Sequence, residues 1–464
     1  MLTFSDRSHG SSPLQRRDFL RIGGLGLGGL GLSDLMALGA AKKSLLKDKS
    51  VIFLFMHGGP SQFETFDPKM DAPSEIRSVT GEIKTAIPGV TFGGTFERLA
   101  KLADKFSIVR SFVTGDAVHD IKTIVGKDTM KANLGSIYSR IAGPLRPGSA
   151  MPTNVALFPQ AISSATMPVI KKFGDFTSSG EFGATYQPFV PGAGSGAQAD
   201  MTLSMPQTRL DDRRTLLTSL DQWKRNMDVS ESIGGASAFQ SLAFDVLRRG
   251  VSDAFDLSKE DPRLIARYDT APLLPKDRIS TQWNNREHYA DNAATLGKLL
   301  LMARRLCERG CGFVTVTTSF VWDMHADNNN APCRTGMDYV GRPFDHAVSA
   351  LIEDIEARGL SEKIMLVCCG EMGRSPKINL KGGRDHWGGL APLMIYGGGL
   401  KMGQVIGQSS SNGGEPASEP ITIPDLIATI MHTLVDLGEA RVTDGLPPNL
   451  LNVLTRGQPI RGLV

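Results

Sequence analysis

The chain has 464 residues, of which 41% are hydrophobic, so it is long enough to bury a substantial core in one large α/β domain or in two or three smaller domains. Its formal net charge of +3 is nearly balanced, and the basic residues are scattered along the chain. This distribution argues against a nucleic-acid-binding surface.

The first 41 residues have the pattern of a twin-arginine signal peptide. Arg16 and Arg17 precede a run rich in glycine and leucine over 22–32, and the small residues at 37–41 offer a cleavage site. A short membrane anchor is the alternative, but the run is brief and rich in glycine. We therefore expect export by the twin-arginine pathway to the periplasm or the cell exterior, with no stable transmembrane segment.

From residue 49 to about 460, apolar strands alternate with amphipathic helices. Strands are expected over 49–56, 106–111, 154–158, 312–318, 364–369 and 392–396, and helices over 95–103, 210–227, 236–249, 292–308, 345–358 and from 422 onward. The stretch from about 160 to 290, made of loops and helices, is expected to be an insert. Such alternation predicts a three-layer α/β/α sandwich with a mainly parallel central sheet.

Four polar clusters follow apolar strands or lie just beyond them. They are His57 with Glu64 and Asp67, His119 with Asp120, Asp323 with His325 and Asp327, and Glu371 with Arg374, Asp385 and His386. In parallel α/β sheets, chemistry collects at the carboxyl ends of the strands. One such pair alone is more typical of a turn carboxylate beside a hydrogen-bonded histidine. Four of them at equivalent positions favour one shared polar site, with or without an ion.

Histidine and carboxylate side chains are the usual protein ligands of zinc, manganese or iron, and an ion there could activate water or polarise an ester oxygen. Asp323 and His325 are two residues apart, so both can face one ion from an extended loop. Asp385 and His386 are adjacent, so we expect one ligand and one orienting partner. The planar guanidinium of Arg374 is expected to hold a phosphate or sulfate group.

Four common kinds of site have no matching motif in the chain. The glycine-rich stretch 397–403 lacks the Lys-Ser/Thr ending of a phosphate loop and the spacing of a dinucleotide-binding fingerprint. No Gly-x-Ser-x-Gly elbow is present, which argues against a serine esterase of the α/β-hydrolase type. The five cysteines include no Cys-x-x-Cys pair that would indicate a structural zinc.

Several segments closely resemble one bacterial family, in order and spacing as well as in content. They include HGGPSQFETFDPK (57–69), LADKFSIVRS (102–111), WDMHADNN (322–329), GEMGRSPKIN (370–379) and GRDHWGGLAPLMIYGGG (383–399). These are similar to the domain-of-unknown-function 1501 family, which is placed in the alkaline-phosphatase-like (sulfatase-like) superfamily. That family usually has Asp where this chain has Glu64, and Phe and Thr where Met372 and Ser375 stand.

The resemblance implies an alkaline-phosphatase-like domain over 49–460, with divalent ions such as zinc, manganese or calcium at the strand ends. The positions that match superfamily ligands are His57, Asp323, His325, Glu371 and His386, and the catalytic candidates are Arg374, His119 and Asp385. The sulfatase motif Cys-x-Pro-x-Arg is absent, so a formylglycine sulfatase is not expected. Ser111, Thr114 and Thr123 lie in the loop that carries the superfamily's nucleophile.

Two functions follow from these observations. The first is an exported, metal-dependent hydrolase of a phosphate- or sulfate-type ester, either a small molecule or an anionic ester carried on a polymer. The alternative is an exported binding or assembly protein that keeps the fold without catalysis. The unmarked nucleophile loop and the presence of Glu64 motivate the alternative.

Overall fold

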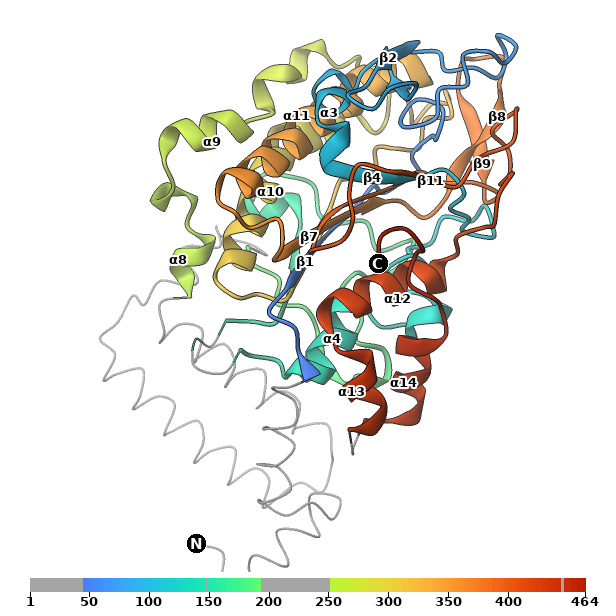
Figure 1. Cartoon of the computed structure of the whole chain (residues 1–464). Helices are drawn as coiled ribbons and strands as arrows, with labels where there is room; N and C mark the ends of the chain where they lie inside the picture. Colours follow the sequence, from blue (N-terminus) through green and yellow to red (C-terminus); the bar gives the residue numbers. More distant parts are fainter. Residues whose placement is uncertain (1–44, 147–148, 150, 193–250, 444–445) are drawn as a thin grey trace, which may run out of the picture.

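A computed structural model describes residues 45–146, 149, 151–192, 251–443 and 446–464 (Figure 1). The expected signal peptide (1–41) and the expected helices over 210–227 and 236–249 lie outside the described residues. Within the described ranges, no helix combines the length and the apolar character needed to cross a membrane.

A seven-stranded sheet forms the centre of the fold, in the order β11–β4–β10–β7–β1–β6–β5. The strands are β1 (Ser50–Phe55), β4 (Phe106–Val109), β5 (Asn154–Leu157), β6 (Phe313–Thr317), β7 (Ile364–Cys369), β10 (Leu393–Gly397) and β11 (Val405–Ile406). Neighbouring strands are parallel except where β10 pairs with β4 and β7. The mainly parallel sheet predicted from the sequence is confirmed.

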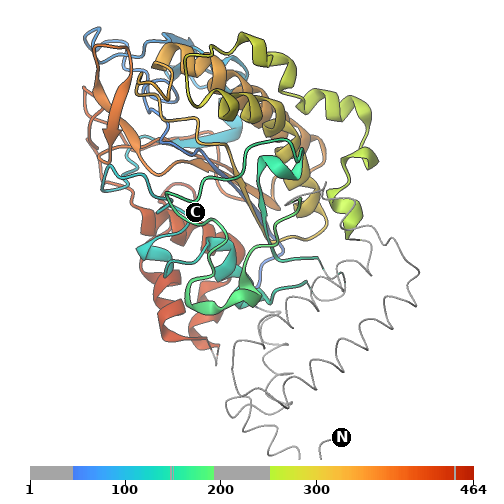
Figure 2. The ribbon, with the colours of Figure 1, turned by 180° about the vertical axis from the view of Figure 1, so that it is seen from behind.

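Helices cover both faces of this sheet (Figures 1 and 2). One face packs against α3 (Glu97–Lys101), α10 (Arg286–Glu308) and α11 (Cys333–Ala357), and the other against α4 (Leu134–Ala142), α12 (Ile423–Leu434) and α14 (Pro448–Thr455). Side chains alternate along β1: Ile52 joins the first core, and Val51 and Phe53 join the second. The predicted three-layer sandwich is therefore confirmed.

Shorter elements lie around this frame. They are the hairpin of β2 (Glu82–Lys84) and β3 (Thr91–Gly93), the helices α8 (Ser252–Phe255), α9 (Pro262–Tyr268) and α13 (Leu437–Val442), and the hairpin of β8 (Gly373–Ile378) and β9 (Arg384–Trp387). In the expected insert, 160–192 has only single 3₁₀ turns, whereas 251–290 contributes α8, α9 and the start of α10.

One helix begins well before its predicted start. The sequence predicts a helix over 345–358, whereas α11 begins at Cys333 and continues through Pro343. A proline inside a helix removes a hydrogen bond and normally indicates a boundary. Here the buried side chains of Met337, Val340 and Phe344 continue the helical spacing on both sides of the proline, and their burial outweighs that loss.

The direction of the strands determines where the polar loops meet. Because β10 is antiparallel to both β4 and β7, β4 runs in the same direction as β7, β1 and β6. The segments that follow these four strands therefore leave the sheet at the same edge. The β8–β9 hairpin follows β7 at that edge and completes the surroundings of the site.

Candidate metal centre

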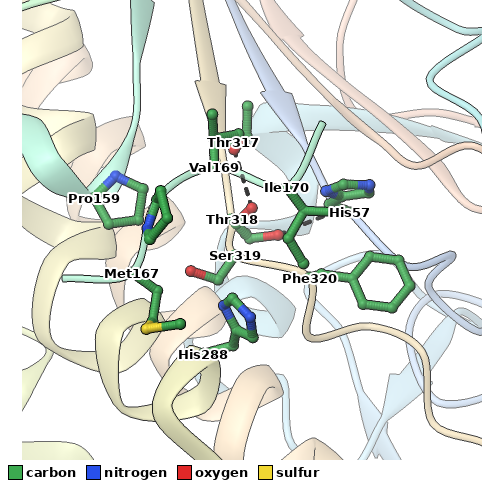
Figure 3. Close-up of a pocket in the computed structure, with 11 residues that line it drawn as sticks. His57, Pro159, Met167, Val169, Ile170, His288, Thr317, Thr318, Ser319 and Phe320 are labelled. Carbon is green, nitrogen blue, oxygen red and sulfur yellow. Dashed lines mark hydrogen bonds between the residues drawn. The ribbon is translucent and has the colours of Figure 1, made fainter. Parts of the chain in front are cut away.

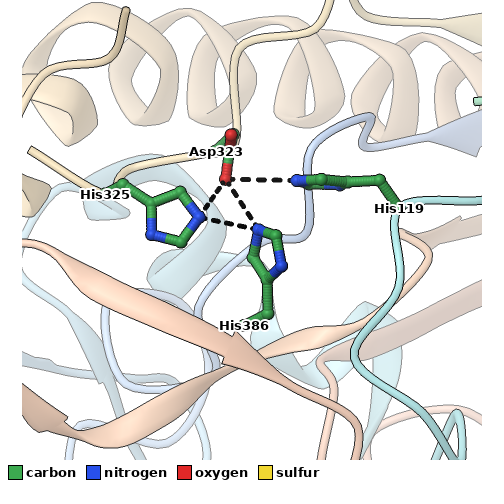
Figure 4. Close-up of side chains that lie close together, drawn as sticks. All are labelled: His119, Asp323, His325 and His386. Atoms are coloured by element: carbon green, nitrogen blue, oxygen red, sulfur yellow. Dashed lines mark hydrogen bonds and ion pairs between the residues drawn. The ribbon is translucent and has the colours of Figure 1, made fainter. Parts of the chain in front are cut away.

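Four side chains from three separate segments lie close enough together to hold one metal ion. His119 follows β4, Asp323 and His325 follow β6, and His386 lies on β9 (Figure 4). One ligand atom from each residue lies within 4.8 Å of all the others. Asp323 is buried, and the three histidines are partly exposed, so one side of the group is open to solvent.

The distances within the group fit a small divalent ion. Oδ1 of Asp323 lies 3.0 Å from Nε2 of His325, 3.3 Å from Nε2 of His386 and 3.4 Å from Nε2 of His119. Tetrahedral zinc with bonds of about 2.0–2.1 Å holds its ligand atoms about 3.3 Å apart. The two nitrogens of His325 and His386 are closer, at 2.7 Å, so these rings would separate slightly around an ion.

The outer atoms of three of these side chains are held by further groups. Nδ1 of His119 lies 2.9 Å from Oε1 of Glu371, and Oδ2 of Asp323 accepts a hydrogen bond of 3.2 Å from Asn330. Nδ1 of His325 lies 3.5 Å from a carboxylate oxygen of Asp385. Contacts of this kind orient metal-binding histidines and select their tautomer.

The contact with Glu371 determines which nitrogen of His119 faces the group. A carboxylate can only accept, so Nδ1 of His119 carries a hydrogen. Nε2 is buried and lies 3.4 Å from Oδ1 of Asp323, so the ring stands between two carboxylates. Burial would lower the pKa of His119, but the contacts with Asp323 and Glu371 raise it. Nε2 therefore faces Asp323 with a proton that a divalent ion would replace, and on this ground these residues fit a metal.

The charges of the group are strongly coupled. Burial alone would raise the pKa of Asp323, but the Arg374 guanidinium and the hydrogen bonds from His119 and His325 hold that pKa well below its ordinary value. Burial lowers the pKa of His386. At neutral pH the group therefore offers an ionised carboxylate on Asp323 and a neutral imidazole on His386, which are the forms that bind metals, whereas His119 would lose a proton on binding an ion.

Arg374 has a different position from the one expected for an anion-binding residue. Its side chain is 1% exposed, and its ion pair with Oδ1 of Asp323 is 2.6 Å long. The remaining N–H groups donate to the carbonyl oxygens of Gly58, Gly59 and Arg384 or contact Nε2 of His325. Each N–H group of Arg374 has a partner within the protein, and two of these partners, Oδ1 of Asp323 and Nε2 of His325, belong to the four-residue group. Arg374 therefore supports the group from within the protein.

Two of the five expected ligands lie outside the four-residue group. Glu371 is fully buried and accepts from the backbone N–H of Gly58 at 2.9 Å, as well as contacting His119. It orients a ligand and does not belong to the ligand set. The His57 ring lies among the aromatic rings of Phe55, Phe173, Phe176 and Phe320. Burial lowers the pKa of His57 to about 4.

The carboxylate of Glu64 likewise forms its contacts outside the group of His119, Asp323, His325 and His386, which is called the metal group below. Glu64 and Arg384 are both fully buried and form an ion pair of 2.9 Å. Glu64 also accepts from the Ser61 hydroxyl and from the backbone N–H of Val79. Its role in the structure is to bind the loop after β1 to the start of β9.

Comparison with known proteins identifies the family. Residues 48–448 match the model of the family described as "Protein of unknown function (DUF1501)". The chain belongs to this family. The resemblance inferred from the sequence motifs is thus confirmed, and no curated protein matches the chain.

Three solved structures align with this DUF1501 protein over most of its length. The phosphonate monoester hydrolase SpPMH from Silicibacter pomeroyi has 11% identity and a TM-score of 0.36, covering 89% of this chain and 78% of its own. The lipoteichoic acid synthase LtaP from Listeria monocytogenes has 7% identity and a TM-score of 0.32, covering 92% and 80%. The PsFucS1 sulfatase from Pseudoalteromonas sp. has 13% identity and a TM-score of 0.31, covering 93% and 76%.

One of these three proteins is described as a sulfatase and another as a phosphonate monoester hydrolase. Their identities and TM-scores are low, so we base no argument about activity on them. The chemistry of this DUF1501 protein has to be inferred from its own residues.

None of the three hydroxyl side chains considered as a nucleophile forms a hydrogen bond with the metal group. Thr123 donates to the carbonyl oxygen of Gly370, and Ser111 is buried against Gly407. Thr114 lines a separate hollow with Lys122 and Thr422. The loop after β4 instead contributes His119 to the group. The sequence did not predict His119 as a ligand, because it lies far along the chain from the other members of the group.

Proposed function

We propose that this DUF1501 protein is an exported, metal-dependent hydrolase of phosphate- or sulfate-type esters. The observation that carries the proposal is the group of three imidazoles and one carboxylate whose ligand atoms lie within 4.8 Å of one another. An exported enzyme would act in the periplasm or outside the cell, on a small or polymer-borne anionic ester. The twin-arginine pattern of residues 1–41 supports export.

The balance of charge supports an anionic substrate. A divalent ion together with Arg374 would outweigh the carboxylates of Asp323 and Glu371 by one positive charge. Because Arg374 and Glu371 are buried, these charges are weakly screened by solvent. A net positive centre at the open side of the group would attract a phosphate or sulfate ester.

The protein's own residues would hold and tune the centre. Glu371 keeps the hydrogen on Nδ1 of His119, and Arg374 fixes the carboxylate of Asp323. Asp385, at the exposed end of His325, is placed to orient that ring. A divalent ion, when bound, supplies Lewis acidity that activates water or polarises an ester oxygen. A water nucleophile would account for the lack of a hydroxyl side chain that forms a hydrogen bond with the group.

Metal analysis together with a substrate panel tests this proposal. Mature protein would be purified, stripped with a chelator and reloaded separately with zinc, manganese and calcium. It would then be assayed on p-nitrophenyl phosphate, p-nitrophenyl sulfate and a phosphonate monoester. We expect bound metal and ester hydrolysis that is lost in His325→Ala. A folded protein that binds no metal and hydrolyses none of the esters with any ion would contradict the proposal.

The second candidate is a non-catalytic exported binding or assembly protein. It is favoured by Ser111, Thr114 and Thr123, none of which forms a hydrogen bond with the metal group. This candidate predicts that His325→Ala leaves the biological role of the protein intact. A deletion strain complemented with this variant distinguishes the two candidates, since a hydrolase would fail to complement.

A further inference from the structure

A small pocket lies beside the metal group at the end of β6 (Figure 3). It has room for about one water-sized group, far less than a small-molecule site offers. Its lining includes the polar side chains of His57, His288 and Ser319 and the apolar side chains of Met167 and Phe320. A pocket of this size and lining fits a single small polar group, such as one hydroxyl.

His57 supplies an unpartnered polar atom to this pocket. Its side chain is buried to 1% exposure, and Nε2 has no hydrogen-bond partner among the described residues. Leaving a buried nitrogen without a partner is unfavourable, so most such atoms in folded proteins are satisfied by some group. The aromatic rings around His57 are not conventional donors or acceptors, and the pocket that His57 lines is a space in which such a partner would fit.

The pocket is one aromatic ring away from the metal group. The ring of Phe320 lies 4.9 Å from the ring of His57 and also 4.9 Å from the ring of His119. A substrate bound at the metal group would have to pass the Phe320 ring to reach the pocket.

We propose that this pocket binds a hydroxyl group on the alcohol portion of the substrate, with Nε2 of His57 as its hydrogen-bond partner. This inference rests on the proposed hydrolase function and makes it more specific. The substrates would be esters of polyols or sugars, in which a free hydroxyl lies near the esterified oxygen. Ser319 and His288 would offer further hydrogen bonds to the same group.

The chemistry of the lining favours a neutral hydroxyl over an anion. Burial lowers the pKa of His57 to about 4 and also lowers the pKa of His288, so both rings are neutral at pH 7. A neutral imidazole both donates and accepts, which matches a hydroxyl group. A purely apolar group would leave Nε2 without a partner, and an anion would meet no positive charge in the lining.

Two alkyl phosphates of equal chain length test the inference. Metal-loaded protein would be assayed on glycerol 1-phosphate and on n-propyl phosphate, which lacks the free hydroxyls. We expect kcat/KM to favour the glycerol ester by about tenfold, the effect of one satisfied buried hydrogen bond. In His57→Phe the ratio should fall towards one, and in His57→Gln, which keeps a polar group, it should partly recover. His346→Gln, a histidine on α11 that contacts the carbonyl of Arg267, is the matched control.

A measurement on metal-free protein separates this inference from the proposed function. The imidazole ¹⁵N resonances of His57 would be followed during titration with glycerol and with 1-propanol. We expect glycerol alone to shift Nε2. Two results would mean that the pocket holds only water. One is a preference for glycerol 1-phosphate over n-propyl phosphate that is equal in wild type and variants. The other is an Nε2 resonance that does not shift with glycerol. If no ester is hydrolysed but glycerol shifts Nε2, the hydrolase proposal fails and the hydroxyl pocket stands.

Substitutions at the edge of the pocket provide a second route if His57→Phe does not fold. Ser319→Ala and His288→Ala remove polar atoms from the lining without placing a larger group in the core. Each should reduce the preference for glycerol 1-phosphate about threefold, as expected for a weaker hydrogen bond. Unchanged ratios in both variants would overturn the inference.

Discussion

Oε1 of Glu371 lies 2.9 Å from Nδ1 of His119, joining two side chains that are 252 positions apart in the chain. Glu371 comes directly after β7, and His119 lies in the long loop after β4. The carboxylate is fully buried and also accepts from the backbone of Gly58. It thereby holds the ring of His119 with Nε2 towards Asp323. One carboxylate thus connects the segments that follow β7, β1 and β4.

Replacement of this carboxylate should weaken metal binding. In Glu371→Gln, the amide still fills the space, but it carries no charge to stabilise the hydrogen on Nδ1 of His119. We expect the affinity for zinc to fall about 10- to 100-fold, the usual effect of losing such an outer partner. Competition with a chromophoric chelator measures this change. Glu75→Gln, at an exposed position, is the control and should retain wild-type affinity.

Loss of the buried Glu64–Arg384 ion pair should destabilise the fold without removing the metal. Both side chains are fully buried, so Glu64→Gln leaves an uncompensated guanidinium. We expect the free energy of unfolding to fall by about 3–5 kcal/mol in urea titrations. The exposed pair of Asp338 and Arg342 offers a control, since Asp338→Asn should cost less than about 1 kcal/mol. Loss of metal stoichiometry at saturating zinc in Glu64→Gln would show instead that Glu64 is a ligand.

Gly58 is required where the loop after β1 passes the loop after β6. Its φ is +115°, and a Cβ at this position would lie 2.6 Å from the backbone nitrogen of Asp323. Gly58→Ala should therefore lower the free energy of unfolding by more than the 1–2 kcal/mol or so of backbone strain alone. It should also weaken zinc binding, because Asp323 must move.

Gly89→Ala is the matched control for this experiment. Gly89 also has a positive φ, +77°, but no atom lies within 4 Å of the added Cβ. This variant should show the backbone strain alone and bind zinc normally. Equal stability losses in both variants would mean that the contact with Asp323 is relieved at no cost.

Asp345 should make stability depend on pH. It accepts hydrogen bonds from the backbone N–H groups of Arg98 (3.0 Å) and Leu99 (2.8 Å). Burial raises its pKa from 3.8 to about 6. Between these values the folded chain keeps a proton that the unfolded chain releases. Asp345 therefore stabilises the fold at acidic pH, and this contribution is lost as the pH rises through 6.

Urea unfolding of Asp345→Asn at pH 4 and pH 7.5 measures this contribution. The asparagine does not titrate, so the stability of the wild type relative to the variant should fall by about 2.4 kcal/mol between the two pH values. Asp338→Asn, an exposed substitution on the same helix, should show no such change. A constant difference between wild type and Asp345→Asn at both pH values would contradict the assigned pKa.

The sequence by itself determined the architecture of this protein. The sequence has continuous apolar strands, such as 49–56 and 364–369, which alternate with amphipathic helices. Both faces of such strands must be buried, which predicts a mainly parallel sheet with helices on both sides. The same pattern predicted that polar residues after the strands would gather at one edge. The motifs around His57 and His386 also identified the family.

Only the tertiary structure decided which of those polar residues meet. His57 and His119 both follow strands that end at the same edge, but His57 packs among the rings of Phe176 and Phe320, whereas Glu371 orients His119 in the metal group. The charged side chains of Glu64 and Arg374 are both used in buried ion pairs inside the protein. The direction of a side chain depends on contacts between loops far apart in the chain, and such contacts leave no local pattern in the sequence.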